Sequence, residues 1–141
     1  MPLRPLGAET VTSQGALRLG YARPMAVEID QTVAHLRTQA TTRRARAQAR
    51  AAHLRRFLPE ARRLLQEEYG AHTVWLFGSL ATGQIHEASD VDLAVEGLPA
   101  DRLLDAAATM MRLFPCDVDL VRLEEAPPSL RDRVRVEGEV L

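Results

Sequence analysis

The hydrophobic pattern of the chain changes at Gly70, and this change constrains the fold more than any other feature. Beyond it, three short apolar runs rich in β-branched residues lie at 73–77, 90–96 and 117–123, with the length and composition of buried strands. Between the second and third runs, residues 99–114 repeat their apolar side chains at helical spacing. This order predicts an α/β (α+β) core, closed by a short helix after two consecutive prolines near the C-terminus.

The segment before this core is predicted to be helical. Residues 25–57 are rich in Ala, Arg, Gln and Leu and contain no Gly or Pro, and Pro24 is typical of a first helical turn. Pro59 kinks or restarts the helix, which then continues to Tyr69. An apolar stripe at helical spacing faces the core there; its residues are Leu54, Leu58, Ala61 and Leu65.

These patterns divide the chain into three parts. We expect an irregular arm over 1–23, in which Val11–Leu19 can form a short strand, a helical region over 24–69 and the core over 70–141. The first 63 residues hold 12 Arg against 4 acidic residues, whereas the remainder holds 6 Arg against 15 acidic residues. For the arginine-rich helix we favour a solvated face or self-association, and next an acidic protein partner. Binding to nucleic acid is the least favoured interpretation, because no aromatic residues are interleaved with the arginines.

Composition excludes several classes of protein. No stretch approaches the roughly 18 uninterrupted apolar residues of a transmembrane helix, and prolines near the N-terminus interrupt any signal-peptide pattern. The single Cys116 has no partner for a disulfide or a metal site, so we expect a reducing, cytoplasmic location and a small buried hydrophobe at this position. We expect Trp75 to pack in the core.

Three pieces of the core carry candidate chemistry. Gly78-Ser79 follows the first predicted strand, Asp90 and Asp92 lie two residues apart on the second, and Asp119 lies on the third. Alternate residues of a strand project to one face, so Asp90 and Asp92 point the same way and Asp119 joins them if the strands are neighbours. Converging carboxylates repel one another unless a cation neutralises them, and oxygen ligands favour Mg²⁺ or Mn²⁺. Asp117 faces the same side and is an alternative third carboxylate.

The Gly78-Ser79 pair fits the phosphate end of a nucleotide. Glycine at the end of a strand lets backbone N–H groups approach an anion closely. Ser79 is a good N-cap for a short helix over 80–82, and the N-terminus of a helix favours negative charge. His86, in the loop before Asp90, either approaches the nucleotide or is a solvent-exposed loop residue. A P-loop is excluded because no Gly-Lys-Ser/Thr follows, and an EF-hand because Ala94 and Val95 occupy its ligand and turn positions.

The combined motif resembles the minimal nucleotidyltransferase branch of the polymerase-β-like nucleotidyltransferase superfamily. The resemblance runs from about Leu64 to the C-terminus; it rests on the segments 76–83 (LFGSLATG), 89–95 (SDVDLAV), 118–121 (VDLV) and 126–130 (APPSL). It implies a mixed sheet backed by helices and Mg²⁺ (or Mn²⁺) held by Asp90, Asp92 and Asp119. Gly78 and Ser79 would bind the nucleotide phosphates, and Asp119, which matches the Asp-Leu-Val position of the family, would receive the acceptor proton.

The resemblance also implies a reaction and a partner. Members transfer a nucleoside monophosphate from an NTP to a hydroxyl; many pair with a separately encoded HEPN-type toxin, and some transfer AMP from ATP to its tyrosine. We therefore expect an antitoxin of this kind. Thr82 stands where many members carry Arg, which keeps open a binding module that neutralises its partner by occlusion. Nucleotidyl transfer to a small molecule is the third hypothesis.

Overall fold

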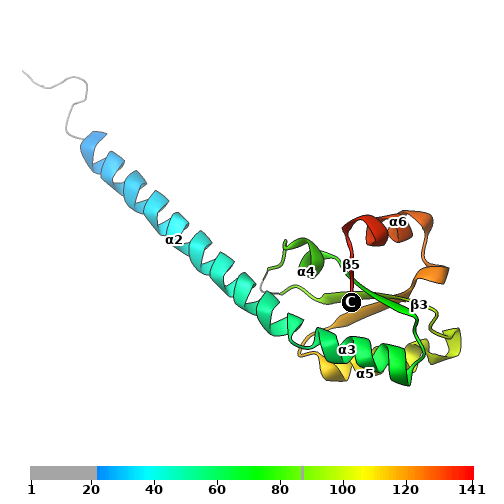
Figure 1. Cartoon of the computed structure of the whole chain (residues 1–141). Coiled ribbons are helices and arrows are strands. Elements are labelled where there is room, and N and C mark those ends of the chain that lie inside the picture. The colour runs from blue at the N-terminus through cyan, green and yellow to red at the C-terminus, as the bar shows by residue number, and fades with distance from the viewer. Residues whose placement is uncertain (1–21, 87) are drawn as a thin grey trace, which may run out of the picture. The chain divides into compact units, whose positions relative to one another are not determined.

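The computed structural model describes residues 22–86 and 88–141 (Figure 1). It divides into two units, one ending at Thr42 and the other running from Arg43 to Leu141. Most of the predicted N-terminal arm, including the strand expected at 11–19, lies outside the described residues. The predicted long helix is present as α2 (Ala22–Arg55) and begins three residues before the predicted start, which places Pro24 inside its first turn, where proline is tolerated.

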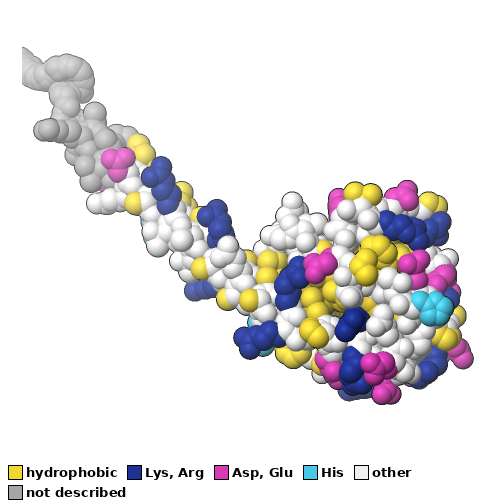
Figure 2. Space-filling view, viewed as in Figure 1, with side chains coloured by type: hydrophobic (Ala, Val, Ile, Leu, Met, Phe, Trp, Pro, Cys, Tyr) yellow, Lys and Arg dark blue, Asp and Glu magenta, His cyan; other side chains and the backbone are white. Residues whose placement is uncertain are grey.

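The part of α2 that belongs to the first unit has little to bury. From Glu28 to Thr42 every side chain is exposed. Ile29, Val33 and Leu36 are 60%, 38% and 53% exposed, and they follow one another at a spacing of four and three residues. This spacing places them on one stripe of the helix, so the part of α2 between Glu28 and Thr42 carries an exposed apolar stripe. The charged side chains visible along α2 in Figure 2 are almost all basic.

The three predicted strands form and are joined by a fourth. The sheet has the order β4-β3-β2-β5; its strands are β2 (Thr73–Phe77), β3 (Val91–Glu96), β4 (Val118–Arg122) and β5 (Glu139–Val140). Strand β2 is antiparallel to β3 and to β5, whereas β3 and β4 are parallel. The sheet is therefore mixed, as the family resemblance implies. Sequence analysis missed β5, because two residues are too few to show an alternating pattern.

Helices cover both faces of this sheet. They are α3 (Leu58–Arg63), the π-helical turn η1 (Leu64–Glu68), α4 (Ser79–Thr82), the 3₁₀ turn η2 (Ala100–Arg102), α5 (Leu103–Leu113), the 3₁₀ turn η3 (Leu123–Glu125) and α6 (Pro128–Glu137). The predicted restart at Pro59 is confirmed, because α2 ends at Arg55 and α3 begins at Leu58 with Pro59 in its first turn. None of the helices in the described residues is both long and apolar enough to cross a membrane.

Each face of the sheet carries its own apolar cluster. On one face the stripe predicted for the helices is fully formed: Leu54, Ala61 and Leu65 are 0% exposed and pack with buried side chains of β2, β3 and α5. On the other face a smaller cluster joins Ala94 of β3 to Val134 of α6. Figure 1 shows α3 and α5 on one side of the sheet and α6 on the other. Because side chains alternate along a strand, Asp92, two residues before Ala94, projects towards the α6 side.

Candidate active site

Two of the predicted carboxylates lie side by side on neighbouring strands. In the parallel pairing of β3 with β4, Asp92 is the direct partner of Asp119. Val121, two residues after Asp119, packs in the cluster on the α6 side, so both carboxylates are on that face of the sheet. Asp117 precedes β4, and its backbone carbonyl accepts a hydrogen bond from the Val91 N–H at 3.2 Å. The register therefore brings Asp119, and not Asp117, next to Asp92.

The electrostatics of Asp92 reflect this crowding. Its pKa is raised from 3.8 to about 6. The largest cause is burial of the carboxyl group, which disfavours its charged form; next come the charge of Asp119 and a hydrogen bond with it, then the charge of Asp90, while Arg133 acts in the opposite direction. Asp92 is half-buried and both neighbouring carboxylates are exposed. A cation would relieve this repulsion.

The donors fit a hard divalent ion, although they do not form a closed cage. Among residues 22–86 and 88–141 no three His, Cys, Asp or Glu side chains are arranged so that they could hold a metal ion. Asp90 immediately precedes β3 and acts on Asp92 through its charge. Mg²⁺ commonly takes only one or two protein carboxylates and fills its shell with water and phosphate oxygens, so the adjacent Asp92 and Asp119 carboxylates are compatible with such an ion.

The Gly78 turn lies directly against this pair. Phe77, the last residue of β2, is the register partner of Asp92, and Gly78 follows with φ +74° and ψ −156°, a conformation that L side chains rarely adopt. A Cβ at position 78 would collide with the Asp92 carboxylate and lie 3.0 Å from its Cγ. Only glycine allows the backbone to pass this close to the carboxylate.

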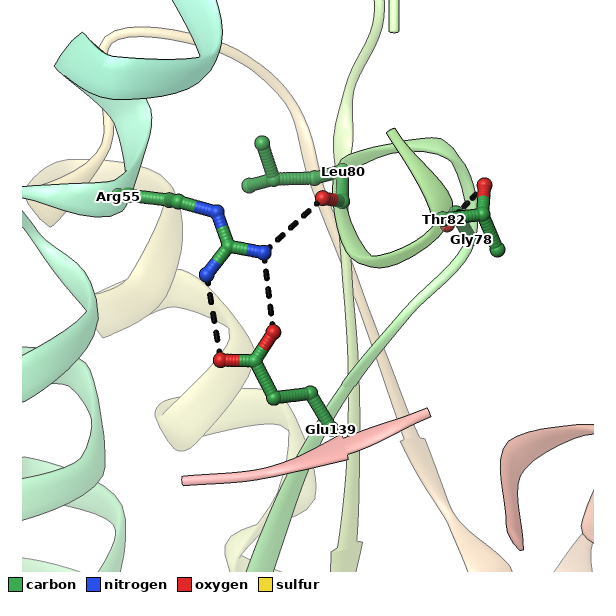
Figure 3. Close-up of polar contacts among 5 residues, drawn as sticks. All are labelled: Arg55, Gly78, Leu80, Thr82 and Glu139. Atoms are coloured by element: carbon green, nitrogen blue, oxygen red, sulfur yellow. Dashed lines mark hydrogen bonds and ion pairs between the residues drawn. The ribbon is translucent and has the colours of Figure 1, made fainter. Parts of the chain in front are cut away.

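The short helix after Gly78 differs in detail from the prediction. Helix α4 begins at Ser79 and not at residue 80, so Gly78 is the N-cap residue and Ser79 lies in the first turn. The Gly78 carbonyl accepts hydrogen bonds from the Thr82 N–H at 3.1 Å and from the Thr82 Oγ1 at 3.3 Å, which close the turn (Figure 3). The hydroxyl at position 82 thus helps to hold the turn shut.

A pocket of about 460 Å³ opens beside these residues. It is lined by Phe77, Gly78, Ser79, Thr82, Gln84, His86, Asp92, Arg133 and Glu137. The predicted Gly78, Ser79 and Asp92 therefore share one cavity. His86 is exposed and accepts a hydrogen bond from the Ala88 N–H at its Nδ1, so it is both a loop residue and part of the pocket wall. Sequence analysis missed Arg133 and Glu137, because nothing in the sequence indicates that α6 lines the site, and it also missed Gln84 in the loop after α4.

Two residues of the arginine-rich helix hold the motif in place. Arg55 donates to the Leu80 carbonyl at 3.2 Å and forms two hydrogen bonds with the Glu139 carboxylate, at 3.1 and 2.9 Å (Figure 3). Arg50 donates to the Ser89 carbonyl from Nε and Nη2 at 3.3 and 3.0 Å. One contact lies just after the Gly78-Ser79 turn and the other just before Asp90, so the end of α2 ties together both parts of the motif.

The two other residues considered in the sequence analysis, Trp75 and Cys116, pack against the core. Trp75 packs against the cluster on the α6 side, and its Nε1 donates to Glu96 Oε1 at 3.4 Å. Cys116 is half-buried and packs against the larger cluster, and burial raises the pKa of its thiol. These contacts confirm the packing predicted for Trp75 and show Cys116 at the edge of the core.

The comparison with protein families agrees with this arrangement. The family model "Polymerase beta, Nucleotidyltransferase" matches residues 60–141, which include the whole sheet and the pocket. The chain belongs to this nucleotidyltransferase family. A comparison with curated proteins gave no significant match.

Chains from solved structures of toxin–antitoxin pairs share the fold of this protein. A chain of a toxin–antitoxin crystallised with AMP-PNP is 28% identical, with a TM-score of 0.51, and the match covers 57% of this chain and 69% of that one. A tyrosine-to-alanine mutant of the toxin–antitoxin MntA–HpeT matches at 29% identity and a TM-score of 0.52, covering 59% and 69% of the two chains. A mutant of the same pair with two aspartate-to-glutamate changes matches at 27% identity and 0.52, covering 58% and 69%.

Proposed function

We propose that this protein transfers AMP from ATP to a hydroxyl group of a separately encoded HEPN-type toxin, with Mg²⁺ as cofactor, and thereby acts as its antitoxin. The observation that carries the proposal is the placement of Gly78, Ser79 and Asp92 in one pocket, with Asp119 beside Asp92. The family supports nucleotidyl transfer in general. The similar toxin–antitoxin chain crystallised with AMP-PNP supports an adenine nucleotide as the donor.

Different residues of the site have different roles in the proposed reaction. Gly78 lets the backbone approach the phosphates, and the Ser79 hydroxyl supplies a hydrogen-bond donor at the same wall of the pocket. Asp92 and Asp119, with Asp90 as the third predicted ligand, would hold Mg²⁺. When bound, the ion neutralises negative charge on the phosphates and orients them for in-line displacement.

Asp119 is the candidate for the proton-accepting group. It is exposed at the edge of the pair, where an acceptor hydroxyl from another protein can reach it. In the proposed step the acceptor oxygen attacks the α-phosphorus, the bond from that phosphorus to the bridging oxygen of the β-phosphate breaks, and pyrophosphate leaves. The acceptor proton passes to the Asp119 carboxylate.

The transfer is tested with purified proteins. The full chain is incubated with ATP labelled in its α-phosphate, Mg²⁺ and the HEPN-type protein encoded beside it, and label on the partner is followed by gel and mass spectrometry. We expect a mass gain of one AMP with the wild type and none with Asp92→Asn. Asp101→Asn is the matched control, because Asp101 is an exposed carboxylate in η2, outside the pocket lining.

The same proteins separate catalysis from simple occlusion. If neutralisation of the toxin requires transfer, Asp92→Asn fails to neutralise it although it still binds. Full neutralisation by Asp92→Asn, with no AMP on the partner, would contradict the proposal and support a binding module. Label on a small molecule in place of the protein would contradict the proposed acceptor.

A further inference from the structure

Helix α6 contains three arginines, and the structure uses them differently. Arg131 donates to the Ala126 carbonyl at 2.7 Å, which holds the start of the helix. Arg135 forms an ion pair with Glu96 at 3.0 Å, which ties the helix to β3. Within residues 22–86 and 88–141, the Arg133 side chain forms no hydrogen bond or ion pair; instead it lines the pocket that contains Gly78, Ser79 and Asp92.

We propose that Arg133 binds the β- and γ-phosphates of the nucleotide and so determines the preference of this pocket for a nucleoside triphosphate. This inference rests on the proposed nucleotidyl transfer and assigns the phosphate-binding cation. A guanidinium presents paired N–H donors that match two phosphate oxygens. Its side chain is exposed to the pocket, so a ligand need not displace an existing partner.

The charges around the pocket support this role. Asp92 and Glu137 are the acidic lining residues, and Arg133 is the one arginine in the lining that the structure describes. A triphosphate stays anionic with one divalent ion bound, so a pocket with only carboxylates would repel it. Arg133 and Asp92 line the same pocket, so this cation shares the cavity with a ligand of the proposed metal.

Helix α4 supplies no cation to this pocket, so the account needs a cation from another element. The side chain of Thr82 is a hydroxyl that bonds to the Gly78 carbonyl at 3.3 Å, so α4 offers the pocket no positive charge. The basic side chains of α2 that contact the motif, Arg50 and Arg55, are bonded to the Ser89 and Leu80 carbonyls. Arg133 is thereby the side chain whose charge remains available to the phosphates within the described pocket lining.

The packing of α6 makes the position of Arg133 well defined. Val134, the next residue, is 0% exposed and belongs to the cluster on that face of the sheet. Glu137, one turn further along, lines the same pocket but forms no ion pair with Arg133 among the described residues. A substitution of Arg133 therefore removes a charge from the pocket without removing a contact that holds the fold.

The test compares nucleotides that differ only in their phosphates. The full chain is titrated calorimetrically with AMP-PNP and with AMP, each with Mg²⁺, for the wild type, Arg133→Gln, Arg133→Lys and the control Arg135→Gln. We expect Arg133→Gln to weaken AMP-PNP binding tenfold or more, equivalent to about 1.4 kcal/mol, and to leave AMP binding unchanged. Arg133→Lys should restore part of the loss, and Arg135→Gln should bind both nucleotides as the wild type does.

The outcomes separate this inference from the proposed function. Equal affinities of wild type and Arg133→Gln for AMP-PNP, or an equal loss for both nucleotides, would overturn the role of Arg133 and leave AMP transfer intact. A selective loss for AMP-PNP in a protein that labels no partner would support Arg133 and contradict the proposed acceptor. A wild type that binds neither nucleotide would overturn both.

Discussion

Replacing Asp92 by Asn is expected to stabilise the metal-free protein. In the folded chain the charged Asp92 carboxylate is penalised by burial and by its neighbours, and its pKa is about 6 in place of 3.8. A difference of one pH unit corresponds to about 1.4 kcal/mol, so the full displacement would correspond to about 3 kcal/mol. Because the side chain is only half-buried, solvent screening reduces this, and we expect about 1–2 kcal/mol.

The pH dependence follows from the sign of this displacement. Well below pH 3.8 the carboxyl group is protonated in both the folded and the unfolded states, so Asp92 does not lower stability there. As the pH rises through the interval between 3.8 and 6, the unfolded state loses its proton first, and the contribution of Asp92 to stability falls. The penalty is nearly complete about one pH unit above the folded pKa of about 6. The stability gain of Asp92→Asn should therefore be small at pH 4 and reach its maximum above pH 7.

The assay is urea unfolding in EDTA at pH 4.5 and pH 8, followed by the fluorescence of Trp75, the single tryptophan. Asp101→Asn is the control, because Asp101 is an exposed carboxylate outside the pocket. Adding Mg²⁺ with AMP-PNP at pH 8 should then stabilise the wild type by mass action and leave Asp92→Asn nearly unchanged. An Asp92→Asn protein that is no more stable than the wild type at pH 8, or equally stabilised at both pH values, would refute the reasoning.

Three further substitutions test the rest of the site and the helix. Gly78→Ala should destabilise the fold by about 1–3 kcal/mol and abolish nucleotide binding, because the added Cβ meets the neighbouring carboxylate; a melting temperature and titration equal to those of the wild type would contradict this. Arg55→Ala should lower the rate of AMP transfer more than Arg56→Ala, whose side chain is exposed, and equal rates would show that the tie to α4 is dispensable. Val33→Glu with Leu36→Glu should shift any self-association of the chain towards monomer in analytical ultracentrifugation, and an unchanged sedimentation profile would exclude this stripe as the contact.

Strands and helices with a strong local pattern were predictable from the sequence. The apolar run 73–77 became β2 without adjustment, and 90–96 became β3 with a shift of one residue at its start, because burial on a sheet requires such composition. The stripe through Leu58 and Ala61 was also predictable, since helical spacing alone places its residues on one face. By contrast, the two-residue β5 has no pattern of its own and forms only because β2 offers it a partner.

The site was predictable in its motif and unpredictable in its surroundings. Alternation put Asp117 and Asp119 on the same face, and only the register with β3 brought Asp119 beside Asp92. Arg55, in an Ala- and Arg-rich helix, has the same sequence pattern whether it is solvated or bonded to the Leu80 carbonyl. The three arginines of α6 likewise alternate with other residues in sequence, and packing of the helix on the sheet decides that Arg133 lines the pocket.

The most direct test of the account is the fate of the two ends of ATP. The wild-type chain, Mg²⁺ and the HEPN-type protein are incubated in parallel with ATP labelled in the α-phosphate and with ATP labelled in the γ-phosphate. Nucleotidyl transfer predicts label on the partner protein from the α-phosphate only, with the γ-label recovered in pyrophosphate. Label on the partner from the γ-phosphate, or from neither, would contradict it.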